Sequence, residues 1–132
     1  MSDQPRGTHT TRLRSDGRTI HTVFLNYVTP SLIEQATTSA TGLLSQMRHV
    51  WYIDFGRVVG FADGMTKVLR PQLQQYRAAG GTDIVARVPE TLRNYKILRT
   101  ALASAALNSG IKLQLFETDQ ETMDFISQIG KH

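Results

Sequence analysis

The segment His49–Phe55, with the sequence HVWYIDF, decides the fold because it is typical of a central β-strand. It is too short to form a helix of ordinary length, and it is rich in aromatic and β-branched residues. We therefore predict a strand that ends near Asp54 and lies inside a sheet, with helices formed by the segments on either side.

Strands and helices alternate outward from this strand. Thr19–Tyr27 carries apolar residues on both alternating faces, which is typical of a buried strand. In chain order we predict strands over 10–14 and 19–27, a helix from Pro30 to Met47 and then the central strand. After the central strand we predict a helix over 63–79, a strand over 83–88 and a helix over 89–108. A strand over 111–116 and a last helix from Thr118 complete the chain. This order predicts an α/β fold with a mainly parallel sheet of four to five strands, one antiparallel edge strand and about four helices.

Several residues mark where the predicted helices begin and end. Thr29 precedes Pro30, a pair that suits a helix start, and Thr118 stands three residues before Glu121 as in a capping box. Gly80 and the glycine after it stop the second helix. Pro71 lies inside that helix, where we expect a kink or a break.

Length and composition limit the classes of function. A chain of 132 residues fits one domain, which we place at residues 10–130 after a polar, disordered tail over residues 1–9. The absence of cysteine excludes disulfides and thiolate chemistry. The net charge of +4 is modest, and no apolar run is long enough to span a membrane or to act as a secretory signal. We expect a cytoplasmic protein without a cofactor.

The element order and three local patterns resemble the STAS domain, the fold of bacterial anti-sigma factor antagonists. The central strand ends in Trp51-Tyr52-Ile53-Asp54, a loop follows over 56–61, and Ala62-Asp63-Gly64-Met65 opens a helix. The last strand and the acidic capped helix, over 116–121, are also similar to the family. The resemblance extends over roughly residues 10–129 and rests on order and spacing together.

The resemblance implies a regulatory module that binds another protein through the loop and helix start at 56–66. The implied contacts are Arg57, Val58, Phe61, Asp63 and Met65. Asp63 stands where the antagonists carry a Ser or Thr that a partner kinase phosphorylates, and Asp cannot accept that phosphoryl group. The partner classes that we consider are an anti-sigma kinase, a transporter subunit and a scaffold protein.

The role of Asp63 has two interpretations. As an N-cap, its carboxylate would accept orphan amide protons at the start of the second helix. As a partner contact, its charge would be recognised directly. The rival function is a small-ligand, anion or metal site in which Asp54, Asp63 and Glu117 gather at the carboxyl ends of the strands.

Other residues that suggest catalysis or nucleic-acid binding have simpler explanations. His21 and His49 lie within predicted strands, no nucleophile has an adjacent base, and the glycine-rich phosphate-binding fingerprints are missing. Arg93, Lys96 and Arg99 recur every three residues and predict a basic strip on the third helix. We expect a solvated face there or docking of an anionic partner, not nucleic acid. An apolar patch on that helix would favour a third alternative, a self-associating structural protein.

Overall fold

The computed structural model describes residues 6–45 and 49–129 and contains one five-stranded sheet in the order β1-β2-β3-β4-β5. The strands are β1 (Thr8–Leu13), β2 (Thr19–Val28), β3 (Val50–Phe61), β4 (Asp83–Arg87) and β5 (Lys112–Phe116); the helices are α1 (Pro30–Gly42), α2 (Met65–Ala78), α3 (Tyr95–Ser109) and α4 (Asp119–Ile129). Only β1 runs antiparallel to its neighbour, and it lies at an edge. The predicted α/β fold class is confirmed.

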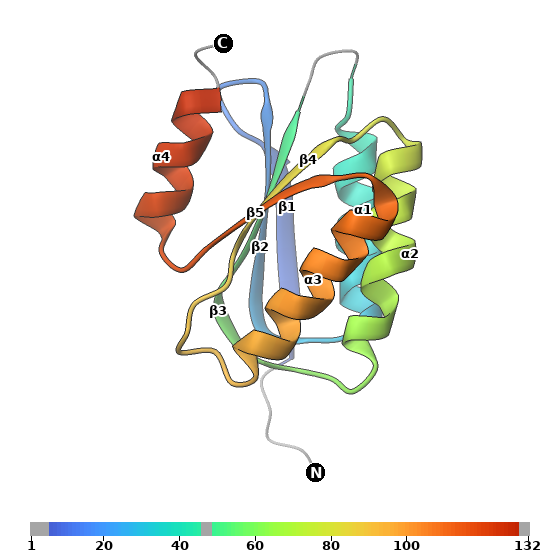
Figure 1. The fold of residues 1–132 in the computed structure, drawn as a ribbon, viewed down its shortest axis with the longest axis vertical. Coiled ribbons are helices and arrows are strands. Elements are labelled where there is room, and N and C mark those ends of the chain that lie inside the picture. Colours follow the sequence, from blue (N-terminus) through green and yellow to red (C-terminus); the bar gives the residue numbers. More distant parts are fainter. Residues whose placement is uncertain (1–5, 46–48, 130–132) are drawn as a thin grey trace.

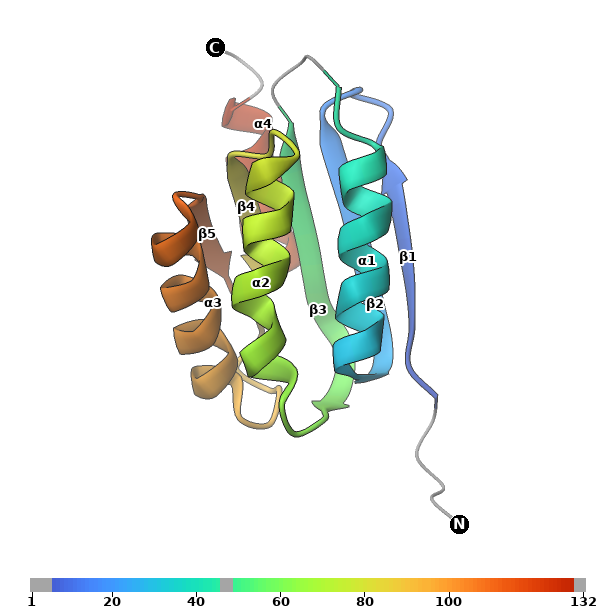
Figure 2. The same cartoon turned by 90° about the vertical axis from the view of Figure 1, so that its right-hand side faces the viewer.

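Helices cover the two faces of the sheet unequally. α1, α2 and α3 lie side by side on one face, and α4 lies on the other (Figures 1 and 2). The main core fills the space between the three helices and the sheet, and includes Phe24, Trp51 and Leu102. A smaller cluster under α4 contains Val50, Tyr52, Val85 and Ile126. The larger core therefore fixes the three-helix layer, while α4 closes only part of the opposite face.

β3 is much longer than predicted. The segment 56–61 was expected to be a loop, but it continues the strand and pairs with β2 as far as the Val28↔Phe61 pair. β4 pairs with β3 only up to Asp54, so the last part of β3 has one neighbouring strand. The prediction that the central strand ends near Asp54 was therefore wrong. β2 supplies backbone partners beyond that point, and buried Val58 anchors the extension to the core.

The chain termini and two helix boundaries also differ from the prediction. β1 begins at Thr8, so the predicted tail over 1–9 is too long, while residues 1–5 lie outside the described part. α1 has Thr29 as its N-cap, as predicted, but it ends at Gly42; Met47, its predicted end, is outside the described residues. α3 begins at Tyr95 because the preceding segment forms turns around Leu92, whose side chain is buried.

Pro71 does not divide α2 in two. The helix is continuous from Met65 to Ala78, with Pro71 on its exposed side. A proline removes one backbone hydrogen bond, and here the bond lost is the one to the carbonyl of Lys67. Lys67 is itself exposed, so water can solvate that carbonyl. The core contacts of Leu69, Leu73 and Tyr76 hold the helix together across the missing bond.

Two leucines of α3 provide a matched test of this packing. Leu102 is fully buried, whereas the Leu107 side chain is 83% exposed. We expect Leu102→Ala to lower the free energy of unfolding by about 2–5 kcal/mol through lost burial and a residual cavity. Leu107→Ala should change it by less than about 0.5 kcal/mol. Urea unfolding of both variants checks this, and similar losses in the two would contradict the packing described.

Candidate functional site

Asp54, Gly56 and Arg87 form a polar clamp at the level of the sheet where β4 ends and β3 continues. Asp54 is buried; its Oδ1 accepts a hydrogen bond from the Gly56 amide at 2.7 Å and lies 3.6 Å from Nη1 of Arg87. Asp54 and Arg87 are direct partners across β3 and β4. A Cβ on residue 56 would lie 2.5 Å from the Arg87 guanidinium, so any other residue there would require the arginine side chain to shift. The clamp neutralises a buried charge and shapes the strand beyond it.

Beyond the clamp, β2 and β3 form a two-stranded ribbon with two irregularities. The register shifts between Val23 and Leu25 and again between Asn26 and Tyr27, and each shift gives β3 one extra residue. Asn26 adopts a φ of 68°, which asparagine tolerates better than most residues. The second extra residue is Val59, whose side chain is 63% exposed. Such bulges turn side chains away from the regular alternation of a strand.

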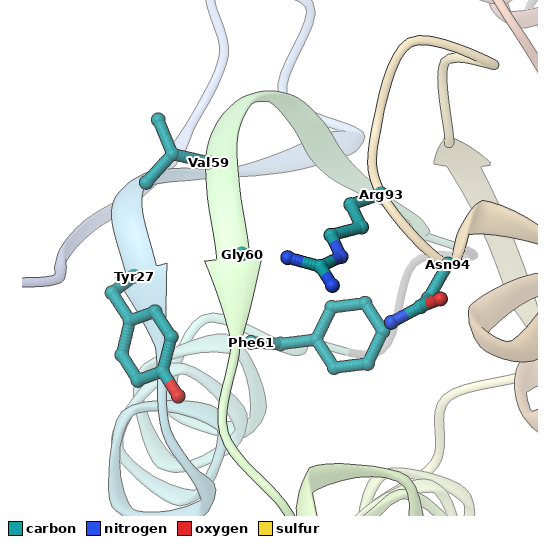
Figure 3. A pocket seen from close by; sticks show the side chains of 6 residues that line it. All are labelled: Tyr27, Val59, Gly60, Phe61, Arg93 and Asn94. Carbon is teal, nitrogen blue, oxygen red and sulfur yellow. The ribbon is translucent and has the colours of Figure 1, made fainter.

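A pocket of about 280 Å³ opens beside this ribbon. Its lining comes from two separate parts of the chain: the ribbon, and the segment just before α3. The lining residues are Tyr27, Val59, Gly60, Phe61, Arg93 and Asn94. Arg93 and Asn94 reach toward Phe61 from one side, while Tyr27 lies on the neighbouring strand (Figure 3). The pocket thus combines aromatic rings with a guanidinium and an amide, and the aromatic residues and arginine are types enriched where proteins bind one another.

The structure separates the five predicted contact residues into two groups. Arg57 and Asp63 are exposed, and Phe61 is half-buried and lines the pocket. Val58 and Met65, however, are buried in the main core and cannot contact a partner. Alternation along β3 explains Val58, which points opposite to its exposed neighbours. Met65 is the first residue of α2 and faces the sheet.

Asp63 is not the N-cap of α2, so that prediction was wrong. The N-cap is Gly64, with a φ of 83°, and no side chain caps the helix. Asp63 instead occupies the second position of a β-turn closed by a hydrogen bond from the Met65 amide to the Ala62 carbonyl. The positive φ of Gly64 at the third position makes this a type II turn. The Asp63 carboxylate therefore projects from an exposed turn.

The three carboxylates of the alternative ligand site, Asp54, Asp63 and Glu117, do not lie close together. Asp54 is held in the clamp, and Glu117 lies 3.4 Å from Arg99. Asp63 lies beyond a stretch of β3 that separates it from Asp54 by about 20 Å. Within residues 6–45 and 49–129 no group of three metal-ligating side chains is found. The neighbouring carboxylate of Glu117 raises the pKa of Glu90 through a shared hydrogen bond and charge repulsion, but both side chains lie at the surface.

The predicted basic strip is not a continuous face of α3. Arg93 precedes the helix and lines the pocket. Arg99 donates a hydrogen bond to the Val88 carbonyl at 3.0 Å, pairs with Glu117 and lies over the Tyr95 ring. Only Lys96 remains an exposed cation on the helix itself. The late start of α3 is the cause, because it removes Arg93 from the helical spacing.

Sequence reasoning missed four residues of the clamp and pocket: Tyr27, Val59, Arg87 and Asn94. Tyr27 and Arg87 lie in segments that were predicted as strands, but their role depends on register, which the sequence pattern does not give. Asn94 adopts a φ of 64° immediately before α3. An asparagine just before a helix start is a recognisable sequence signal. The predicted helix over 89–108 placed Asn94 inside the helix, so this signal was overlooked.

Comparison with known proteins supports the architecture. A crystal structure of an uncharacterized DUF3478 family protein with a SpoIIAA-like fold, from Shewanella loihica PV-4, superposes with a TM-score of 0.63 and 14% identity, covering 95% of this chain and 98% of that chain. The unphosphorylated anti-sigma factor antagonist SpoIIAA superposes with a TM-score of 0.56 and 11% identity, covering 91% and 98%. The chain has the SpoIIAA-like fold. The predicted STAS resemblance is confirmed at this level.

Other comparisons add no further assignment to the SpoIIAA-like fold. No family model matches the sequence, and no curated protein matches it. Among the residues that the structure describes, no helix has the length and apolar character needed to cross a membrane.

Opposite the three-helix layer, a polar cluster lies between the sheet and α4. The His21 ring stacks on Tyr52 with ring centres 4.4 Å apart, and the Tyr52 hydroxyl donates to Asp119 of α4 at 2.7 Å. Burial lowers the pKa of His21 and Arg14 lowers it further, while Asp54 and Asp119 act in the opposite direction. The histidine is therefore a neutral packing residue near pH 7.

This environment gives His21 a measurable effect on stability. Below the unfolded pKa near 6.5, the unfolded chain binds a proton that the folded chain resists, so stability falls as the pH drops through that value toward the lower folded pKa. We expect wild type to lose more unfolding free energy than His21→Phe between about pH 8 and pH 5.5. The phenyl ring keeps the stacking on Tyr52. Urea titrations at both pH values measure the difference, and equal losses would show that His21 titrates normally.

The position of Asp63 yields a second test, with Thr29 as the matched control. Thr29 accepts a hydrogen bond from the Leu32 amide at 3.2 Å and caps α1. Thr29→Ala should cost about 0.5–2 kcal/mol of stability. Asp63→Ala should change stability by less than about 0.5 kcal/mol, because Asp63 caps nothing. Thermal melts compare them, and a loss at Asp63 equal to that at Thr29 would restore the capping role.

Proposed function

We propose that the protein is a non-enzymatic regulatory module that binds another protein at the tip of the β2–β3 ribbon. The observation that carries this proposal is the pocket beside Phe61, where the ribbon meets Arg93 and Asn94. An aromatic ring and an arginine side by side are the groups that most often dominate the binding energy of protein interfaces. The anti-sigma factor antagonist SpoIIAA, which shares the fold, supports the same class of function.

The proposed contact surface consists of side chains that the structure leaves accessible. Arg57 and Val59 project from the ribbon, Phe61 lines the pocket, and Asp63 projects from the turn after it. Arg93 completes the surface from the segment before α3. Val58 and Met65 support it from below as core residues. In this arrangement Phe61 and Arg93 act as anchors, and Asp63 sets the selectivity for a partner's charge.

A fixed charge at Asp63 distinguishes the proposed mechanism from a phosphorylation switch. Aspartate carries one negative charge, whereas a phosphoserine carries about −1.5 to −2. Binding would therefore depend on the abundance of the partner and not on a kinase acting at residue 63. The candidate partner classes are an anti-sigma kinase, a transporter subunit and a scaffold protein, in the cytoplasm. No cofactor is required.

The histidines support a function without catalysis. His21 is a stacking residue, and His49 is buried between Ser45 and the Arg18 carbonyl, with its ring nitrogens 2.9 and 3.1 Å from those groups. Neither histidine lines the pocket beside Phe61. A general base must reach the reacting group within hydrogen-bond distance. The pocket is therefore better suited to recognition than to turnover.

Calorimetry with the natural partner tests the proposal. Affinity purification from the source organism with mass spectrometry identifies the partner, and titration then compares wild type with Phe61→Ser, Arg93→Glu and Asp63→Asn. We expect losses of about 2 kcal/mol or more for the two anchors, and of about 2–5 kcal/mol for Asp63→Asn if its charge pair is buried. Asp63→Asn affinity equal to wild type would remove the charge from the recognition scheme.

The controls separate binding from folding. Leu13→Ser changes an exposed apolar residue on β1, outside the proposed surface, and should leave affinity unchanged. Thermal melts verify that each variant is folded. Unchanged affinity in both Phe61→Ser and Arg93→Glu would place the interface elsewhere. Turnover by the purified protein that Asp63→Ala abolishes would overturn the proposal of a non-enzymatic module.

A further inference from the structure

The outer surface of α2 and α3 has an unusual distribution of charge. The two helices together contain five cations, Lys67, Arg70, Arg77, Lys96 and Arg99, and no acidic residue. Surfaces of soluble proteins ordinarily mix both signs. Arg99 is engaged with Glu117 and Val88, but no ion pair among the described residues involves the other four. Lys96 has a charge interaction with Glu90, but the two helices still present an excess of positive charge on this face.

An apolar and uncharged strip lies among these cations. Ile97 is 55% exposed and Leu107 is 83% exposed, and they are two of the four large apolar side chains exposed in the described residues. Between them the solvent side of α3 carries only small residues, Thr100, Ala103 and Ser104. The exposed parts of these two aliphatic side chains gain no burial within the monomer. Both features instead suit an interface.

The strip borders a shallow groove between the two helices. The groove has a volume of about 520 Å³ and is lined by Thr66 of α2 and by Lys96, Ile97, Thr100, Ala101 and Ser104 of α3. Arg70 and Arg77 stand four and eleven residues after Thr66, which places them on the same side of α2 as Thr66. Arg77 lies near the end of α3, where its Nε is 3.9 Å from the position of a Cβ on Gly110. α2 and α3 lie side by side along the molecule (Figure 2). The groove therefore has an apolar floor and basic rims.

We propose that this groove docks an acidic amphipathic helix of a protein partner. The small residues of α3 allow a third helix to approach closely, and Ile97 and Leu107 would contact its apolar face. Glutamate or aspartate residues flanking that face would lie against Arg70, Arg77 and Lys96. A partner of about four turns would match α3, which is about 22 Å long. This surface is separate from the pocket beside Phe61, so the protein would hold two partner segments.

A second copy of the chain does not meet these requirements. Two identical α2–α3 faces would bring cations against cations, which disfavours a symmetric dimer through this surface. The acidic helix of this chain is α4, with Asp119, Glu121 and Asp124. Its apolar residues Met123, Phe125 and Ile126 already pack against the sheet. α4 is therefore acidic, but the apolar side chains that the structure describes in it already pack against the sheet.

Selection from a peptide library tests the proposal. The library consists of helical peptides of about 16 residues with leucines fixed at helical spacing and the flanking positions varied among Glu, Lys and Gln. Selection on the intact protein should enrich Glu at the flanks. The selected peptides should lose about tenfold or more in affinity for Ile97→Ser, Leu107→Ser and Arg70→Glu. Fluorescence anisotropy measures these affinities.

Matched controls lie on the opposite edge of the sheet. Leu13→Ser and Arg12→Glu make the same kinds of change on β1, where both residues are exposed, and should leave peptide affinity unchanged. Failure to select peptides, a preference for Lys, or insensitivity to the α3 variants would each overturn the proposal. So would a failed selection in which vesicles of phosphatidylglycerol and phosphatidylcholine bind wild type but not Ile97→Ser, because the face would then recognise lipid.

Discussion

The contact between Asp54, Gly56 and Arg87 is the constraint on which the β2–β3 ribbon beyond β4 depends. A carboxylate as buried as that of Asp54 needs both a counter-charge and hydrogen-bond donors, and it obtains them from β4 and from its own strand. The first irregularity in β3 lies directly after this contact, at the level where β4 ends. The part of β3 that follows it, from Arg57 to Phe61, pairs only with β2 and supplies three residues of the pocket lining, Val59, Gly60 and Phe61.

The two faces of the sheet differ in how much apolar surface their helices bury. Three helices and the sheet enclose a large core, which gives rigidity to the ribbon that projects beyond β4. α4 covers a small cluster together with polar contacts to Tyr52, so the second face contributes less apolar burial. The proposed recognition surfaces lie outside this core, which supports them without depending on them. The exposed side chains at the tip and along α3 are free to diverge while the fold persists.

Much of the fold was predictable from the sequence, but the pocket was not. His49–Phe55, the Thr29-Pro30 start of α1 and the Thr118–Glu121 cap are local signals, and each lies where local chemistry placed it. The extension of β3 over 56–61 depends on pairing with β2, and two glycines made that segment look like a loop. The late start of α3 depends on burial of Leu92. Arg93 and Phe61 line the same pocket because of both the β3 extension and the late start of α3. The sequence of neither segment alone therefore predicts the pocket.

The extra residue at Val59 has a consequence for comparing this chain with others of the same fold. The bulge absorbs this residue, because Gly60 and Phe61 still pair with Tyr27 and Val28 of β2. Deleting Val59 would remove only the second of the two irregularities and would leave Gly60 and Phe61 opposite the same partners. A protein of this fold without the extra residue should therefore be aligned to this chain with a one-residue gap at Val59. An alignment without that gap would match Gly60 and Phe61 to residues that lie one position away in space.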